Sequence, residues 1–436
     1  MTFVINRQPL NQTPGYNEMT LNVSSSNYEE LQYKYVLDTY VDTVLVSTSK
    51  LFPRPDGNCY FDAQPIVKNY LGSNRVPTQI SMSNGMANSV VEVYVECSEQ
   101  FTSGSNLYSS PILATTENML AYEMVAPYSY NDLKVYMYGY SPFWDLDDYY
   151  NAGLANVPGP RVEPTLSYST DGSKSISNRD TYPINEYEPR TISIINGISG
   201  SQQRIDHMTV RVQTNDNQVK ELNYDMMVAS SLPVNTITNI PVDIIGINAM
   251  ETGSSTIPAG LSGSIEPTTD IAYSIEFWTD DVLYWYKPIM FNIDDNCYQY
   301  EHIIVQYRTP NGGWWYIPCD LKNYYSQANE RVVIERKRQY GDNAQFQSRK
   351  VTNMSGIGSY ILNTNWMQSD GFVEEVKDML NSPDIYLIKQ STTNTYDYVI
   401  PVVVKTSEYT VRKPSQDNLI QYTLEFEEAF TKKYTV

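Results

Sequence analysis

The sequence predicts a mainly β protein made of several β-sandwich or barrel-like domains, with one short amphipathic helix in the C-terminal domain. Three observations predict this class. Short stretches of alternating apolar and polar residues recur along the chain, separated by turn residues such as Asn, Gly and Pro. Tyr occurs 38 times against 11 Phe and 6 Trp, and its polar tip suits half-exposed sheet faces and protein interfaces. One segment alone has a convincing helical period.

The length of 436 residues is enough for two to four domains with substantial cores. We expect an N-terminal β-sandwich of the immunoglobulin or fibronectin type over residues 1–150 and a second β domain over residues 190–284. Residues 151–189 are rich in Pro, Gly, Ser and Asp, which is typical of an extended linker or arm. The C-terminal β domain then covers residues 285–436.

The N-terminal region contains two clear strand patterns and one short helix. Tyr33–Asp42 alternates in polarity, and Val44–Ser47 follows as its partner. Asp62 is placed to cap a short helix. The apolar side of that helix consists of Ile66, Val67, Tyr70 and Leu71. Ser89–Cys97 is a strand with Glu92 and Glu96 on its polar face. Its apolar face consists of Val91, Val93, Val95 and Cys97.

The second β domain begins with a strand at Ile192–Ile195. Asp206–Gln213 and Gln218–Tyr224 form a hairpin across an Asn-Asp-Asn turn, because Asn and Asp tolerate turn conformations. Ile271–Phe277 is a further strand.

The C-terminal domain is organised around a hairpin at His302–Ile317. Ile303, Val305 and Tyr307 share one face, and Gln306 and Arg308 share the other. A Thr-Pro-Asn-Gly-Gly turn follows, and two Trp, one Tyr and one Ile form the return strand.

Residues 370–381 form the predicted amphipathic helix of this domain. Asp370 or Ser369 caps its start, and Pro383 ends it. The apolar stripe consists of Phe372, Val373, Val376, Met379 and Leu380. Three strands follow, at Ile385–Lys389, Tyr396–Thr406 and Leu419–Glu427.

Several of these segments resemble virion structural proteins of tailed phages that infect Bacteroidetes, crAss-like phages included. The similar segments cover about the first quarter and the last third of the chain. They are Tyr33–Tyr70, Lys287-Pro288, Leu362–Trp366, Ser382–Tyr386, Ile400–Val404 and Asn418–Phe426. The resemblance is a pattern of strands and turns without a catalytic signature. It implies a tail, collar-ring or baseplate component of the virion, made in the bacterial cytoplasm.

The charge of the chain is uneven. The net charge is −20, so we expect no direct nucleic-acid binding. Residues 1–150 and 151–285 each carry 7 basic and 16 acidic groups, whereas residues 286–436 carry 16 and 18. A local charge of +4 lies between residues 331 and 350. Its basic members are Arg331, Arg336, Lys337, Arg338, Arg349 and Lys350. They form either an exposed strand whose charges discourage edge pairing, or a contact with the acidic surface of a neighbouring subunit.

The sequence contains no recognisable catalytic arrangement. His207 and His302 each stand alone, and no nucleophile elbow, phosphate loop or zinc-protease motif occurs. Cys297, His302 and Cys319 match no structural zinc spacing. We therefore expect no enzyme activity, metal or cofactor. The four cysteines form no CxxC pair, and we expect neither a signal peptide nor a membrane segment.

Two functions of different classes remain. The first is a non-enzymatic structural subunit that forms a homo-oligomeric ring and contacts other proteins of the portal-tail assembly. The alternative is a carbohydrate-binding adhesion or depolymerase component, because aromatic rings on β-sandwiches can stack on sugars. The candidate stacking residues are Trp278, Trp285, Trp314 and Trp315.

Overall fold

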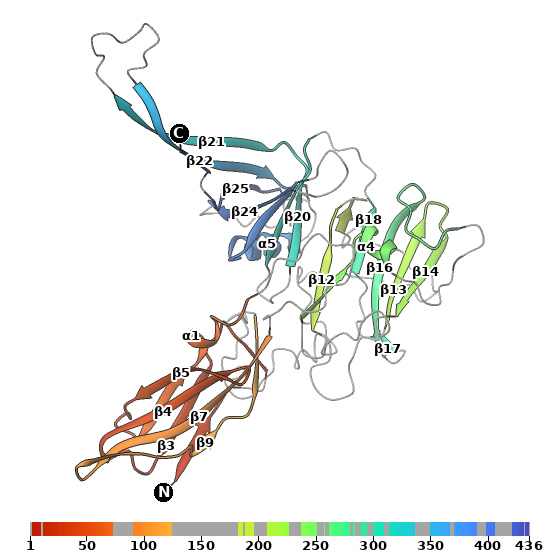
Figure 1. Cartoon of the computed structure of the whole chain (residues 1–436). Helices are drawn as coiled ribbons and strands as arrows, with labels where there is room; N and C mark the ends of the chain where they lie inside the picture. Colours follow the sequence, from red (N-terminus) through yellow and green to blue (C-terminus); the bar gives the residue numbers. More distant parts are fainter. Residues whose placement is uncertain are drawn as a thin grey trace, which may run out of the picture. The chain divides into compact units, whose positions relative to one another are not determined.

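The computed structural model confirms a mainly β protein (Figure 1), with strands making up 60% of the described residues. The structure describes residues 2–9, 12–72, 90–123, 182–185, 188–195, 207–225, 237–250, 257, 261–279, 282–283, 289–293, 300–308, 314–335, 349–366, 370–389, 398–405, 421–430 and 432–435. The chain divides into two compact units. The first comprises Met1–Pro158, Thr191–Asn292 and Pro310–Gly313, and the second comprises Gly159–Arg190, Ile293–Thr309 and Trp314–Val436.

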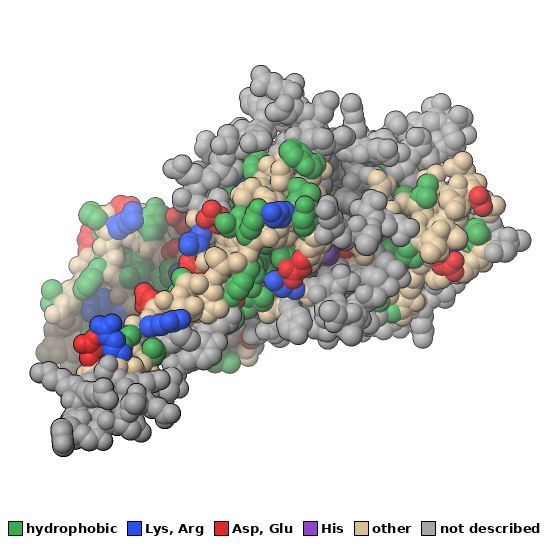
Figure 2. All heavy atoms as spheres, turned by 90° about the horizontal axis from the view of Figure 1, so that it is seen from above, with side chains coloured by type: hydrophobic (Ala, Val, Ile, Leu, Met, Phe, Trp, Pro, Cys, Tyr) green, Lys and Arg blue, Asp and Glu red, His purple; other side chains and the backbone are tan. Residues whose placement is uncertain are grey.

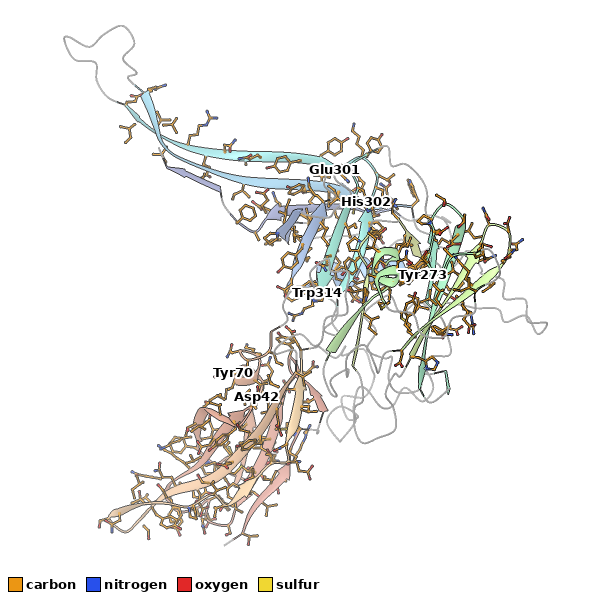
Figure 3. All side chains as sticks on the ribbon, turned by 45° about the vertical axis from the view of Figure 1, so that its right-hand side comes forward. Asp42, Tyr70, Tyr273, Glu301, His302 and Trp314 are labelled. Carbon is orange, nitrogen blue, oxygen red and sulfur yellow. The ribbon has the colours of Figure 1, made fainter. Side chains whose placement is uncertain are left out.

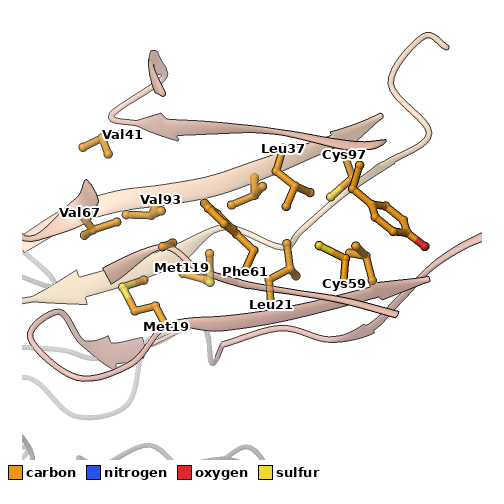
Figure 4. Packing of buried hydrophobic residues seen from close by; sticks show 14 of the residues in the cluster. Met19, Leu21, Leu37, Val41, Cys59, Phe61, Val67, Val93, Cys97 and Met119 are labelled. Carbon is orange, nitrogen blue, oxygen red and sulfur yellow. The ribbon is translucent and has the colours of Figure 1, made fainter. Parts of the chain in front are cut away.

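The N-terminal region is a sandwich of two sheets. The smaller sheet has the order β1 (Phe3–Arg7), β3 (Thr20–Ser25), β6 (Asn58–Asp62). The larger sheet has the order β2 (Gln12–Pro14), β10 (Met119–Tyr122), β7 (Val90–Ser103), β4 (Leu31–Val41), β5 (Val44–Leu51). Two further short strands, β8 (Asn106–Ser109) and β9 (Ala114–Thr115), also pair with β7. Figure 4 shows the core between them, where Leu21 and Phe61 face Leu37 and Val93. Both sheets lie within residues 1–150, where the N-terminal domain was expected.

The strand alternation predicted here is confirmed. Along β7, the burial pattern alternates so that Val91, Val93 and Val95 are buried while Glu92 lies on the other face. The short helix α1 (Gln64–Val67) begins after Ala63, but the side chain of Asp62 still accepts a hydrogen bond of 3.0 Å from the amide of Gln64. Asp62 therefore satisfies an amide at the start of the helix, as predicted.

The middle region contains a second β arrangement. One sheet includes β14 (Val219–Asp225), β13 (His207–Thr214), β16 (Asp270–Thr279) and β18 (Ile289–Ile293) in that order, with β17 (Val282–Leu283) also on β16. β12 (Thr191–Ile195) pairs with β15 (Ile237–Pro241), and the short helix α4 (Ile244–Ala249) follows. Asp243 caps α4 by accepting a hydrogen bond from the amide of Gly246. The predicted hairpin around residue 216 is β13–β14.

The C-terminal region is one antiparallel sheet with a helix. Its order is β20 (Trp314–Cys319), β19 (Ile303–Arg308), β23 (Ile385–Lys389), β24 (Tyr398–Val404), β25 (Thr423–Glu428), β22 (Arg349–Asn363), β21 (Tyr324–Glu335). A further strand, β26 (Lys432–Thr435), also pairs with β22. Helix α5 (Asp370–Leu380) contributes Val376 and Met379, both fully buried, to the core beside the sheet. The predicted helix 370–381 and strand Ile385–Lys389 are confirmed.

The central hairpin differs from its predicted half-polar pattern. Ile303, Val305 and Tyr307 lie in the main core, as the alternation predicts. Ile304 and Gln306 on the opposite face are also buried. Gln306 is accommodated because its side-chain amide donates a hydrogen bond of 3.1 Å to the hydroxyl of Tyr316. Both faces of β19 are therefore covered, although the sequence predicted one wet face.

Two predicted domain boundaries differ from the structure. β18 lies within the predicted C-terminal domain but pairs with β16, so it belongs to the middle sheet. Most of the predicted linker 151–189 lies outside the described residues. Its described end is not solvated, since Glu188 and Arg190 are each 2% exposed. The strand pair β16–β18 and the hydrogen bond from Arg190 to the carbonyl of Tyr316, 126 residues away, are contacts that the local sequence pattern does not contain.

In the part of the chain that the structure describes, none of the helices is both long and apolar enough to span a membrane.

Candidate assembly surface

The most exposed regular element is a long arm, formed by β21 and the part of β22 that pairs with it, with β26 on the other side of β22 at residues 353–356. All twelve residues of β21 are exposed. Figure 1 shows the two strands running side by side beyond the shorter strands β24 and β25. Among the described strands, β21 pairs with β22 alone and forms one edge of the sheet. A long exposed edge strand offers backbone groups to another chain, so most proteins shorten or cover such edges.

The middle of the arm is polar, and two glycines account for its packing. Gly356 of β22 lies opposite Asn329 of β21. A β carbon at residue 356 would lie 2.5 Å from Nε2 of Gln327 and 2.7 Å from Oδ1 of Asn329. The Gln327 amide donates a hydrogen bond of 2.9 Å to Asn329. At Gly358, the side chain of Glu428 occupies the same kind of space. These glycines let polar side chains lie across the ribbon.

The distal end of the arm is apolar, in contrast to its middle. Val332, Val333 and Ile334 are 56%, 48% and 55% exposed. Three consecutive exposed β-branched residues are unusual on a solvated ribbon and indicate a surface that another chain covers. Figure 2 shows hydrophobic side chains interspersed with acidic and basic ones over the face seen from above.

The arm contains the described members of the predicted basic segment. Arg331 lies in β21 and is exposed, and Arg349 begins β22. Arg349 forms an ion pair with Glu335 of its own chain, so part of the predicted positive charge is neutralised locally. Lys350 is described in its backbone only. Arg336, Lys337 and Arg338 lie outside the described residues.

Two of the four Trp residues proposed for the alternative carbohydrate site are buried. Trp314 and Trp315 are 1% and 2% exposed, so neither ring face is open to a sugar, contrary to the hypothesis. Trp314 lies in the C-terminal sheet region (Figure 3), with its ring centroid 5.9 Å from that of Tyr386. The side chains of Trp278 and Trp285 lie outside the described part. Trp366, which the sequence did not single out, is 53% exposed.

A buried ionic cluster in the second unit holds residues 188–190 against the central hairpin. Arg190 donates two hydrogen bonds to Oε1 of Glu188, of 2.9 and 2.7 Å, and one of 3.1 Å to the carbonyl of Tyr316. Its guanidinium also lies 5.5 Å from the ring centroid of Trp315. This cluster was missed because residue 190 appeared to be a domain boundary. The contacts of Arg190 with Glu188, Tyr316 and Trp315 anchor residues 188–190 to β20.

Helix α5 adds a buried carboxyl group to the same region. Glu375 is 4% exposed, although it lies outside the apolar stripe predicted for this helix. Burial raises the pKa of its carboxyl group to about 8, even though Arg190 and the indole of Trp315 favour the ionised form.

His302 is buried and hydrogen-bonded to Asp320. Burial lowers the pKa of His302, but the hydrogen bond and the charge of Asp320 outweigh this effect, and the net pKa is raised. Asn365 in turn donates to Asp320. The histidine is thus part of a polar network at the start of β19.

The described residues contain no group of three metal-ligating side chains close enough to hold an ion. Cys319, one of the zinc candidates considered, is fully buried, and burial raises the pKa of its thiol well above the usual value. A thiol in this state is a poor ligand and a poor nucleophile. Cys297 lies outside the described residues.

No protein-family model matches the chain, and no curated protein matches it either.

Proposed function

We propose that the protein is a non-enzymatic structural component of a bacteriophage virion, a tail, collar-ring or baseplate subunit that assembles into a homo-oligomeric ring. The observation that carries the proposal is the exposed β21–β22 arm, which extends a sheet edge and ends in an apolar segment. The resemblance of the first quarter and last third of the chain to phage virion proteins supports the same assignment. Other proteins of the portal-tail assembly are its expected neighbours.

The physical argument for assembly concerns surface that an isolated subunit leaves exposed. In an isolated subunit, a long exposed ribbon with three half-exposed β-branched residues at its end would promote aggregation, because the edge strand can pair with other chains. Covering that ribbon by another subunit removes apolar area from water, which is the usual driving force for association. The charge split between acidic residues 1–285 and the nearly neutral remainder favours contact between unlike surfaces of neighbouring copies.

Sizing of the purified chain by light scattering tests the proposal. We expect a discrete oligomer larger than a dimer, because a ring closes at a fixed subunit number. A matched variant in which residues 333–352 are replaced by an Asn-Gly turn, which joins the directly opposed Val332 and Asn353, should keep the circular dichroism of a β protein and lose the oligomer. A chain that stays monomeric over a wide range of concentration contradicts the proposal.

The carbohydrate-binding alternative rests on one observation, the exposed Trp366. A glycan-binding screen on the same preparation separates the two functions. Binding that is lost in Trp366→Ala, together with a monomeric chain, would favour the adhesion role.

A further inference from the structure

The distal end of β21 is complementary to itself when it is read in the opposite direction. Arg331 and Glu335 place opposite charges at its two ends, and Val332, Val333 and Ile334 lie between them. We infer that this five-residue segment pairs antiparallel with the same segment of a second copy of the chain, about a two-fold axis at Val333.

The geometry of β21 suits such pairing. β21 is the edge of its sheet among the described strands, and pairing adds a strand to that edge. The register shift near its distal end lies between the pairs Val332–Asn353 and Val333–Val351, so the extra residue is on β22. β21 itself therefore continues without a bulge through the proposed contact.

The two-fold register places unlike charges opposite each other twice. With the axis at Val333, Arg331 faces the partner's Glu335, and Glu335 faces the partner's Arg331. Val332 faces the partner's Ile334 in the same way, so apolar residues meet apolar ones. Directly opposed side chains in an antiparallel pair have β carbons about 4.5–5.5 Å apart, close enough for both kinds of contact.

Neighbouring registers lack this match. A shift by one residue places Glu330 opposite the partner's Glu335, which opposes like charges. A shift by five residues pairs Glu330 with the partner's Arg331 but places Val332 and Ile334 against Asn329 and Gln327. The register with its axis at Val333 is the one that satisfies both the charged and the apolar side chains.

The charges that this contact needs are exposed. The side chain of Glu335 remains 63% exposed while it pairs with Arg349 through Oε1. An ion pair this exposed is weak and yields readily to a shared arrangement. Arg331 is exposed along with the rest of β21.

The inference rests on the proposed function in one respect, which is that copies of the chain associate. A contact of five residues is weak by itself, but it acts at high effective concentration when other contacts hold the subunits together. Because a two-fold contact joins two copies and does not close a ring, it links subunits of two different rings rather than neighbours within one ring.

Single-cysteine variants test the register. Val333→Cys places two thiols at the axis, and mild oxidation should give a covalent dimer. Ala328→Cys, on the same exposed strand, is the matched control. Its two copies would lie ten strand positions apart, about 34 Å, and should not cross-link. Neither substitution disturbs a core, because both residues are exposed. The wild-type chain controls for its own thiols, of which Cys59, Cys97 and Cys319 are buried.

Mixing of charge variants gives a second, independent readout. Arg331→Glu alone and Glu335→Arg alone each oppose like charges in the symmetric pair and should weaken association about tenfold, equal to about 1.4 kcal/mol. A one-to-one mixture of the two variants restores both unlike pairs, and its dissociation constant should return to within about twofold of wild type.

The outcomes separate this inference from the proposed function. Cross-linking at residue 333 but not 328, with recovery in the mixture, supports the two-fold register. An oligomer of wild-type size in which residues 333 and 328 cross-link equally or not at all overturns the inference and leaves the proposed function standing. A monomeric wild-type chain overturns both.

Discussion

Several ionisable residues of this protein are buried together with their partners. Lys220 and Asp270 form an ion pair of 2.6 Å with side chains 1% and 0% exposed. Glu99, 2% exposed, accepts hydrogen bonds from Ser25, Tyr33 and Asn27. The partners of these charges come from residues far away in the chain. Removal of one partner therefore leaves the other charge unpaired in an apolar interior.

Glu375→Gln should alter the pH dependence of stability. The folded protein holds a proton on Glu375 up to about pH 8, whereas the ordinary pKa is 4.5. The folded state therefore binds more protons than the unfolded state between these pH values, and stability falls as pH rises through them. In the variant the unfolding free energy should fall less as pH rises. Above pH 8 the variant should be more stable than wild type by on the order of a few kcal/mol.

Urea unfolding of the wild type and Glu375→Gln between pH 4.5 and 9 measures that difference. The raised pKa of His302 gives a loss of stability in the same direction, so the comparison between the two proteins isolates Glu375. Parallel curves would contradict a proton held on Glu375.

Lys220→Met should destabilise the middle region by about 3–5 kcal/mol, because the charge of Asp270 loses its cationic partner. The double variant Lys220→Met, Asp270→Leu should recover part of this loss, since no charge is then buried. Thermal unfolding measures both. Equal melting temperatures for the single variant and wild type would show that the pair is not buried in solution.

At the level of elements, the C-terminal sheet and α5 depend on each other. α5 buries Val376 and Met379 against residues of β19, β22 and β23. The arm differs from this, because all twelve residues of β21 are exposed. One strand of the sheet, β19, is therefore covered on both faces, whereas β21 is exposed on both.

Val376→Asp should cost about 3–5 kcal/mol of unfolding free energy, because it places a charge where the native side chain is fully buried. Lys377→Ala, at the exposed neighbouring position of the same helix, should change stability by less than about 0.5 kcal/mol. If the two variants melt alike, α5 does not pack as described.

At the level of the whole molecule, charge distribution should govern association. Reversal of Arg336, Lys337 and Arg338 to Glu should weaken oligomers, because a basic segment then becomes acidic in a chain of net charge −20. The isolated subunit should stay folded. Oligomers of the variant should depend less on salt than those of wild type.

Light scattering at low and high salt, with circular dichroism as the folding control, measures this. Unchanged assembly at both salt concentrations would show that the segment is a solvated strand.

Sequence alone was sufficient for features that depend on neighbouring residues. The alternation of β4 and β7, the hairpins β13–β14 and β19–β20 and the helix α5 all follow from local period and turn residues. The basic segment at residues 331–350 was likewise visible as charge.

The tertiary structure decided everything that depends on what covers an element. Trp314 and Trp315 read equally well as an exposed stacking platform or as core, and their burial follows from packing against distant segments. β18 pairs with β16 of the middle sheet, and the buried Arg190 donates a hydrogen bond to the carbonyl of Tyr316. Neither partner can be identified from the local sequence pattern. The exposure of β21 has the same cause. The alternation of residues along a strand shows which side chains share a face, whereas contacts across the fold determine whether that face meets water or protein.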